Sequence, residues 1–383
     1  MRFAIVAPNR AHERALSEGD IHAAAHDFTA VFVRAGGRAR DRHPFADPGD
    51  CRDPPGEIHL PWLAQGSFAF VYMAQAKGFM KKRAINMDIA RGFGSFASAQ
   101  SISSGQFDCG LCAAPALTLS VVKGLPLIAL ATTDYDATMG VGVLADSAIQ
   151  KPQDLAGKKI ASVPTSAEFP FLPAYAKKIG LDLSTVESVH VDNKVIERVL
   201  VEKQVDAITN FAASSYAVML SKGVASRWVL YSTAGIKNHG QTIAVTKDTL
   251  AKDPAFCEAM VDGLLEGIAF TLTNPDETVE IFLKQLPEMA LNPSAKDLVH
   301  LGLATWQHSV DKPEARTHGL GWSDPQAFAE MTDLVMQYLA EPGTKRPELD
   351  ALFTSRFTGN IKLDEVQWAK VRARVAEYDK VFT

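Results

Sequence analysis

Apolar and polar positions alternate in a regular way from Glu57 onward. Short apolar runs such as EIHLPWL and INMDIA are typical of buried strands, whereas SFAFVYMAQAKGF and FASAQSISSG carry apolar residues at helical spacing and stop at a glycine. The strings DCGLC, APALTLSVVKG and LPLIALATT continue the alternation of strand and helix. This order predicts an α/β domain with parallel strands and right-handed crossovers.

A second unit repeats the pattern. A strand at 160–163 leads into a loop and a helix near Phe169, and KQVDAITNFAASSYAVMLSKGV is similar to the earlier GQFDCGLCAAPALTLSVVKGL. Both strings hold Gln-x-Asp, a short strand, a small-residue turn and an apolar helix closed by Lys-Gly. In this register Cys109 corresponds to Ala207 and Cys112 to Asn210. The similarity is consistent with two lobes of the same construction.

The rest of the chain is mainly helical. GQTIAVTKDTL is one more strand, and four later segments each begin at an Asp, Asn or Pro, which suits an N-cap or a first helical turn. Two crossings between the units, outward at 140–144 and back at 242–245, predict a hinged clamp that binds a ligand between its lobes. We expect lobe I to hold residues 57–140 plus 246–383, and lobe II to hold residues 141–245 including the hinge strands.

Residues 1–56 have a different character from the rest of the chain. They end in the turn-rich stretch GGRARDRHPFADPGDCRDPPGE, and the first 20 residues lack the small-residue cleavage pattern of a secretion signal. We interpret these residues as a leader that is not part of the core fold.

Composition and charge remove several classes of function. A formal charge of −5 without a basic block argues against nucleic acid as a partner. No apolar run approaches the ~18 residues that cross a bilayer. The four cysteines are too sparse for a disulfide framework and lack the second close pair of a zinc site. We expect neither a metal nor a cofactor.

Candidate ligand contacts are given by one rule: open α/β sheets bind ligands at the carboxyl ends of parallel strands. Trp62 and Trp322 are candidates for stacking on a planar ligand. The expected contacts, all at predicted strand ends or in the Gly-rich loop HGLGW, are Trp62, Gln65, Phe93, Cys112, Asp134, Tyr135, Ser166, Glu168, Asn193, Asn210, Phe211 and Trp322.

Cys109 and Cys112 have the spacing of a redox pair, but a strand directs their thiols to opposite faces. Cys109 is expected in the core. Cys112, at the strand end, is interpreted first as a packing residue or neutral pocket wall, with a nucleophilic or redox role as the alternative.

PTSAEF presents a second ambiguity. Thr165, Ser166 and the backbone amides can receive an oxygen-bearing or anionic group. Alternatively, Thr165 or Ser166 caps the helix, and Glu168 completes a capping box with Thr165. The two roles are compatible within one turn.

From about Glu57 to the C-terminus the chain resembles the substrate-binding proteins of ABC importers, in the branch for pyrimidine precursors of thiamine, nitrate, sulfonates and taurine. The resemblance is carried by IHLPWLAQGSFAFVYMAQAKGFMKKRAINMDI, GQFDCGLCAAPALTLSVVKGLPLIALA, KPQDLAGKKIA and VEKQVDAITNF. It implies a two-lobed type II periplasmic-binding-protein fold that closes on a small solute without a catalytic step. It also implies a membrane permease as partner and a periplasmic location.

The same fold hosts enzymes, so alternatives stay open. A desulfinase-like enzyme would use Cys112, whereas a thiamine-pyrimidine-synthase-like enzyme would need a cysteine-rich loop that the chain lacks. A cytoplasmic sensor is a third interpretation. Among ligands, a planar nitrogen heterocycle is favoured over a sulfonate, because Arg91 is the only arginine near a predicted strand end while Asp134, Glu168 and Asp192 lie near such ends.

Overall fold

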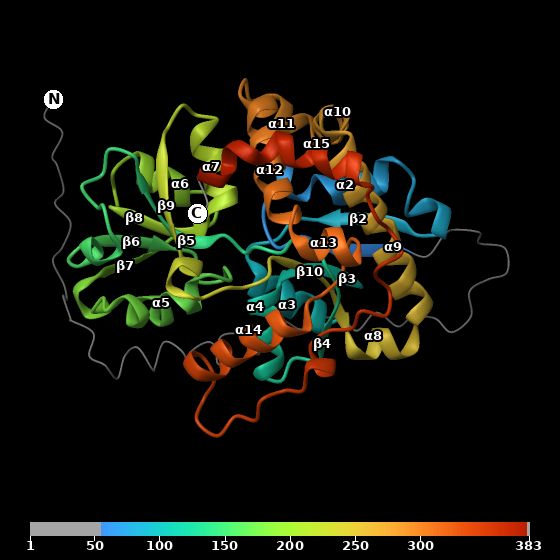
Figure 1. Ribbon diagram of the computed structural model, residues 1–383, viewed down its shortest axis with the longest axis horizontal. Coiled ribbons are helices and arrows are strands. Elements are labelled where there is room, and N and C mark those ends of the chain that lie inside the picture. Colours follow the sequence, from blue (N-terminus) through green and yellow to red (C-terminus); the bar gives the residue numbers. More distant parts are fainter. Residues whose placement is uncertain (1–54, 381–383) are drawn as a thin grey trace, which may run out of the picture. The chain divides into compact units, whose positions relative to one another are not determined.

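The computed structural model describes residues 55–380, and the rest of the predicted leader lies outside this range. The first sheet runs in the order β2 (Asn86–Ala90), β1 (Pro55–His59), β3 (Cys109–Ala113), β10 (Gln241–Thr246) and β4 (Leu127–Thr132). Strands β1, β2 and β3 are parallel, whereas β10 is antiparallel to both of its neighbours. Figure 1 labels β2, β3, β10 and β4 of this sheet.

The second sheet has the same design. Its order is β7 (Glu187–His190), β6 (Lys159–Ser162), β8 (Ala207–Phe211), β5 (Met139–Leu144) and β9 (Ser226–Leu230). Here β5 is the strand that runs antiparallel to both neighbours. The sheets are therefore mixed rather than all parallel, because each receives one strand at a crossing between the two halves.

The internal repeat predicted from the sequence coincides with equivalent strands. Cys109–Ala113 and Ala207–Phe211 form β3 and β8, so Cys112 and Asn210 occupy the same position. Asp108 and Asp206 precede these strands and also act alike. Each carboxylate accepts a hydrogen bond from a backbone N–H of the adjacent parallel strand, at 3.2 Å from Glu57 and 2.9 Å from Lys159.

Helices cover both sheets, and most begin where the sequence predicts. Asp253 and Asp324 each cap a predicted helix through a side-chain hydrogen bond to a backbone N–H. Asp364 caps α15 in the same way, and this helix was not predicted. The helices are α2 (Ala69–Ala76), α3 (Ser95–Ser103), α4 (Ala114–Val122), α5 (Leu172–Ile179), α6 (Ile196–Val201), α7 (Ala212–Leu220), α8 (Lys247–Lys252), α9 (Pro254–Thr273), α10 (Pro275–Gln285), α11 (Pro287–Ala290), α12 (Ala295–Val310), α13 (Pro313–His318), α14 (Pro325–Tyr338) and α15 (Glu365–Val375). Short 3-10 segments include Gly66–Phe68, Phe169–Phe171 and Tyr231–Ala234.

Alternate residues of the first sheet pack into different clusters. Cys109 and Leu111 belong to the core that also holds α2 and α9, whereas Cys112 packs with small residues of α3 and α4 and with α14. The prediction that the two thiols diverge is confirmed. The strand alternation thus buries both faces of the sheet.

Two boundaries differ from the sequence prediction. The return strand at 241–246 pairs with β3 and β4, so its assignment to lobe II was wrong, and the return crossing lies before it, at 235–240. Partner strands decide membership of a sheet, and they are distant in sequence. Pro55 and Gly56, placed in the leader, are already part of β1.

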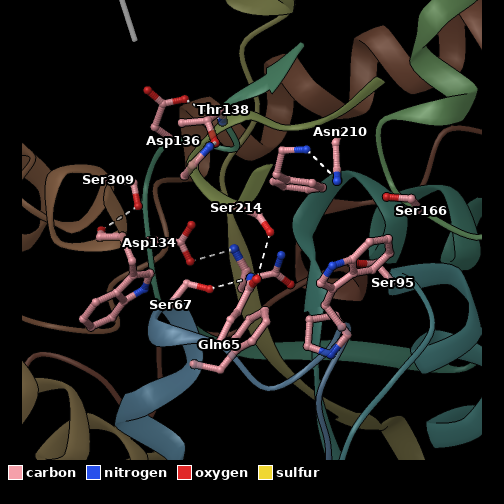
Figure 2. A pocket seen from close by; sticks show the side chains of 17 residues that line it. Gln65, Ser67, Ser95, Asp134, Asp136, Thr138, Ser166, Asn210, Ser214 and Ser309 are labelled. Atoms are coloured by element: carbon pink, nitrogen blue, oxygen red, sulfur yellow. Dashed lines mark hydrogen bonds between the residues drawn. The ribbon is translucent and has the colours of Figure 1, made fainter. Parts of the chain in front are cut away.

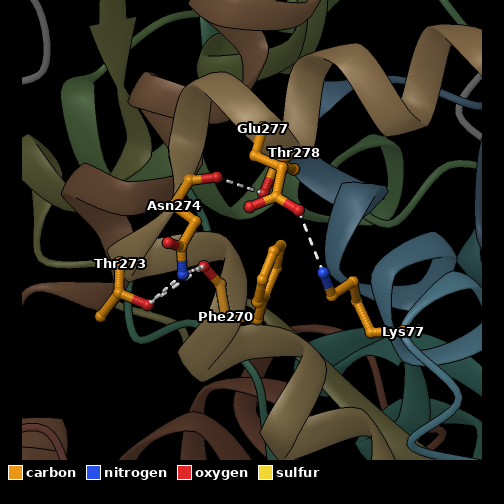
Figure 3. A network of polar contacts seen from close by, with 6 residues as sticks. All are labelled: Lys77, Phe270, Thr273, Asn274, Glu277 and Thr278. Carbon is orange, nitrogen blue, oxygen red and sulfur yellow. Dashed lines mark hydrogen bonds and ion pairs between the residues drawn. The ribbon is translucent and has the colours of Figure 1, made fainter.

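Polar contacts connect α2, α9 and α10, which pack beside the first sheet. Lys77 of α2 forms an ion pair with Glu277 of α10 at 3.0 Å and lies 4.6 Å from the ring centroid of Phe270. Figure 3 shows this network at the junction of α9 and α10. Within residues 55–380, no helix is both long and apolar enough to cross a bilayer.

Candidate functional site

A cleft lies where loops of the two sheets face each other (Figure 2). Its walls combine aromatic rings with many small polar groups. The lining residues are Pro61, Trp62, Gln65, Ser67, Phe68, Ser95, Asp134, Asp136, Thr138, Ser166, Asn210, Phe211, Ala213, Ser214, Gln241, Trp306 and Ser309.

Strand ends supply part of this lining. Trp62 comes after β1, Ser166 comes after β6, and Asn210 and Phe211 end β8. Asp134 lies in the outward crossing between β4 and β5. These positions agree with the rule that ligands bind beyond the carboxyl ends of parallel strands.

The structure brings half of the predicted contacts into the cleft. These are Trp62, Gln65, Asp134, Ser166, Asn210 and Phe211. The other six lie outside the lining, and each has a local reason.

Cys112 is fully buried, and its thiol donates to the Ser95 carbonyl oxygen at 3.3 Å. Burial raises the pKa of this thiol, so the nucleophilic thiolate is disfavoured. The side chain therefore packs behind Ser95, which itself lines the cleft. Its interpretation as a packing residue fits these contacts, whereas nothing in them activates it as a nucleophile.

Glu168 and Asn193 are buried in the second lobe and do not line the cleft. The capping box, one of the two alternatives for PTSAEF, is absent, because Thr165 donates to the Phe93 carbonyl oxygen and Glu168 accepts from Ser166. The Ser166 N–H donates to the Val163 carbonyl oxygen at 3.0 Å, so it is not available to bind an anion. The amide of Asn193 is buried with no hydrogen-bond partner among the described residues.

The aromatic candidates outside the lining are held by other contacts. Phe93 is 46% exposed, with the guanidinium of Arg91 5.6 Å from its ring centroid. Tyr135 packs against His239. Trp322 stacks on His318 with ring centroids 3.9 Å apart, so it is not free to stack on a ligand in the cleft.

Several lining residues escaped sequence reasoning. Asp136 and Thr138 continue the crossing that begins at Thr133, and the Thr138 N–H donates to Asp136 Oδ1 at 3.0 Å. Ser214 sits in the first turn of α7, just after the strand end at Phe211. Scanning a few residues beyond each strand end would have found these three. Trp306 and Ser309 come from α12, and no local signal marks them.

The charge of the cleft is one-sided. Asp134 and Asp136 line it, and the lining contains no Lys, Arg or His. Burial raises the pKa of Asp134 to about 7, although Oδ1 accepts hydrogen bonds from the Gln241 N–H and the Thr133 hydroxyl. In Figure 2 both aspartates lie on the side opposite Ser166 and Asn210.

Three of the six lining hydroxyl groups donate their hydrogens to acceptors inside the protein. Ser166 donates to Glu168, Ser214 donates to Gln65 Oε1 at 2.8 Å, and Ser309 donates to the Trp306 carbonyl oxygen at 2.7 Å. What these oxygens can offer a ligand is therefore their lone pairs. The other three hydroxyl groups, of Ser67, Ser95 and Thr138, accept hydrogen bonds inside the protein, so their hydrogens remain for a ligand. The cleft therefore offers donors as well as acceptors, and its two aspartates add to the acceptors.

Direct contacts join the two lobes around the cleft. The Ser214 to Gln65 bond is one, and the Thr305 hydroxyl of α12 donates to the Ala213 carbonyl oxygen at 3.0 Å. On another side, the Phe96 N–H donates to the Thr165 carbonyl oxygen at 3.2 Å. The lobes are thus in contact around the cleft in this structure.

Neither a metal nor a catalytic cysteine is indicated by the described residues. No group of three or more His, Cys, Asp or Glu side chains within residues 55–380 is arranged to hold a metal ion. Cys109 and Cys257 are buried free cysteines, like Cys112.

Two mixed sheets, joined by two crossings and facing each other over a cleft, define the fold of the periplasmic binding proteins. The structure of the periplasmic aliphatic sulphonate binding protein from Escherichia coli is similar, with a TM-score of 0.58 at 15% identity over 76% of this chain and 94% of that one. The model of the NMT1/THI5 like family matches residues 65–278, more than half of the 383 residues. The chain belongs to that family, which confirms the resemblance drawn from its motifs.

Two curated relatives match most of their own length. A Haemophilus influenzae protein named for thiamine biosynthesis is 25% identical over 240 residues, covering 62% of this chain and 75% of its own. The formylaminopyrimidine-binding protein of Halalkalibacterium halodurans is 19% identical over 276 residues, covering 72% of this chain and 82% of its own.

Proposed function

We propose that this protein is the solute receptor of an ABC importer and closes its two lobes on a small, planar, nitrogen-containing heterocycle of the pyrimidine type. The observation that carries the proposal is the polarity of the cleft: two aspartates and several acceptor oxygens line it, and no cationic side chain does. An amino group or a ring N–H satisfies such acceptors. A sulfonate or nitrate would face them without a counter-charge.

Two further points support this interpretation. Trp62 and Trp306 both line the cleft and can provide apolar surfaces for a planar ring. A relative that matches 72% of this chain is named for binding formylaminopyrimidine. The enzyme alternative finds no support at Cys112, since its thiol is buried away from the cleft. In the proposed role the protein works outside the cytoplasmic membrane and delivers the solute to a permease.

The test is a calorimetric titration of the full chain with three probes: 4-amino-2-methylpyrimidine, taurine and nitrate. We expect the aminopyrimidine alone to bind. Trp62→Ala should weaken its binding about tenfold, because an aromatic contact and its buried area are lost. Trp322→Ala is the matched control, since that indole stacks on His318 outside the cleft, and it should leave the affinity unchanged. Binding of taurine or nitrate but not of the pyrimidine would refute the proposal.

A further inference from the structure

A buried carboxyl group stands directly behind the lining of the cleft. Ser166 lines the cleft, and its hydroxyl donates to Glu168 Oε2. The Glu168 side chain is fully buried, and Oε1 has no hydrogen-bond partner among the described residues. Burying a carboxyl group in this position costs free energy unless hydrogen bonds compensate.

The surroundings of Glu168 offer it little else to bind. The side chains that interact electrostatically with the Glu168 carboxyl group are those of Ser166, Thr209 and Tyr231. None of them is a cation. The Thr209 hydroxyl donates to Ser162 Oγ at 2.7 Å, and Tyr231 stacks on Tyr175 with ring centroids 4.6 Å apart. Ser166 is therefore the principal hydrogen-bond partner of this carboxyl group.

Ser166 differs in this respect from Ser214 and Ser309, the other two lining serines whose hydroxyl groups donate inside the protein. Ser214 and Ser309 donate to neutral acceptors, an amide and a backbone carbonyl oxygen. Hydrogen bonds to a carboxylate are shorter and stronger than bonds to neutral acceptors. The hydroxyl hydrogen of Ser166 is thus held toward Glu168 more firmly than its counterparts are held, and the oxygen's lone pairs remain for the cleft.

We propose that Glu168 is a positioning residue that fixes the Ser166 hydroxyl as a hydrogen-bond acceptor toward the cleft, so that this end of the cleft selects a ligand group that donates. The inference rests on the proposed function and adds the polarity of the ligand atom at Ser166. A ligand group that only accepts would meet the oxygen of Ser166 without a hydrogen between them, and two buried acceptors would stay unpaired.

The protonation state of Glu168 bears on the conditions of the test. Burial raises the pKa of this group to about 7. Below that pH the neutral acid can donate to Ser166 and release the serine hydrogen. At about pH 8.5 the ionised form predominates and cannot donate.

The experiment compares two probes that differ at one ring substituent, 4-amino-2-methylpyrimidine and 4-methoxy-2-methylpyrimidine, by calorimetry at about pH 8.5. The full chain should prefer the amine about tenfold. Glu168→Met and Ser166→Ala should each abolish this preference. The double variant should behave like Ser166→Ala alone, because Glu168 acts only through that serine. Glu187→Gln, an exposed carboxylate paired with Lys159, is the control and should keep the preference.

The inference would be overturned if folded Glu168→Met kept the preference for the amine. It would also be overturned if the double variant bound the amine more weakly than Ser166→Ala does. A second readout needs no ligand: the infrared carboxylate band that is absent from Glu168→Gln should shift in Ser166→Ala. An unshifted band overturns the inference even if both pyrimidines bind. If neither pyrimidine binds the native chain, the proposed function fails, and the infrared band alone decides the role of Glu168.

Discussion

Two buried carboxyl groups give the residues around the cleft a shared electrostatic character. Asp134 belongs to the outward crossing and Glu168 to the second lobe, and desolvation raises the pKa of each to about 7. Neither has a cationic partner among the groups that shift it. Both therefore hold a proton more tightly in the folded chain than in the unfolded chain, and this has a measurable consequence for stability.

We predict that the stabilisation contributed by Asp134 and Glu168 falls as the pH rises from about 4 through about 7. The sign comes from linkage: each of these two carboxyl groups binds its proton more tightly in the folded state, so raising the pH removes its contribution. The buried His59, whose pKa burial lowers to about 4, acts in the opposite direction. Glu168→Gln removes the contribution of Glu168 to this pH dependence. For a pKa raised from 4.5 to about 7, that contribution is about 3 kcal/mol of unfolding free energy at most. Urea denaturation at about pH 5 and about pH 8 measures the difference. A variant as pH-dependent as the native chain would contradict the prediction.

The sequence predicts well that a residue lies in the cleft when the course of the backbone alone places it there. Trp62, Ser166 and Asn210 lie in the cleft because a strand ends beside them. Cys112 occupies the same kind of position, yet its side chain faces the helices on the other side. Trp306 reaches the cleft through the packing of α12 on the first lobe, and only the tertiary fold carries that information.

For the strands, the sequence predicts most positions along the chain but not which strands pair. Their positions are indicated by apolar runs, and the predicted runs for β1, β2, β3 and β4 are confirmed. Strand β9 at Ser226–Leu230 was missed because Arg227 interrupts its apolar pattern, and this arginine instead donates to carbonyl oxygens of Ser147 and Ile149. Strand β10 was found but placed in the wrong sheet. Local pattern does not contain the pairing partner of a strand.

The start of α3 lies close to the second lobe. Gly94, its N-cap, has φ 128°, and a Cβ atom there would lie 2.1 Å from the carbonyl oxygen of Thr165. Thr165 in turn donates to the carbonyl oxygen of Phe93. A side chain at position 94 would therefore separate these two loops, besides straining the backbone.

We predict that Gly94→Ala weakens binding of the aminopyrimidine about tenfold, because the lobes can no longer meet at this point. Gly105→Ala is the matched control. It ends the same helix with φ 73°, and a Cβ atom there meets nothing within 4 Å. The control should lower the melting temperature only slightly and leave affinity intact. Calorimetry and thermal unfolding separate the two effects, and equal affinity of both variants would rule out a role for this contact.

On the scale of the whole molecule, no continuous sheet joins the lobes. They meet through the packing of α12 on α7, through an apolar cluster with residues of both lobes, and through polar contacts. The bonds from Ser214 to Gln65 and from Thr305 to Ala213 cross between them. Each such bond contributes about 1 kcal/mol, so an equilibrium between open and closed lobes responds to the loss of one.

Removal of the Gln65 contact is therefore predicted to favour the open state. In Ser214→Ala without ligand, energy transfer between dyes at positions 123 and 202 should report a larger open fraction, about fivefold in the equilibrium constant. Saturating aminopyrimidine should restore the closed distance. Ser221→Ala is the control, because its hydroxyl donates only to Val218, just upstream in the chain. Identical signals from the two variants would exclude this contact as a closing element.

The exchange of strands between the halves sets an order of assembly. Every strand of the second sheet lies between Met139 and Leu230, so a ribosome that has released this stretch has delivered that sheet complete. The first sheet, although its strands begin at Pro55, lacks β10 between β3 and β4 until Thr246 has been synthesised. The half of the protein that is made first is thus the last that can finish folding. Until then, the edges of β3 and β4 are open to any chaperone that recognises unpaired strands.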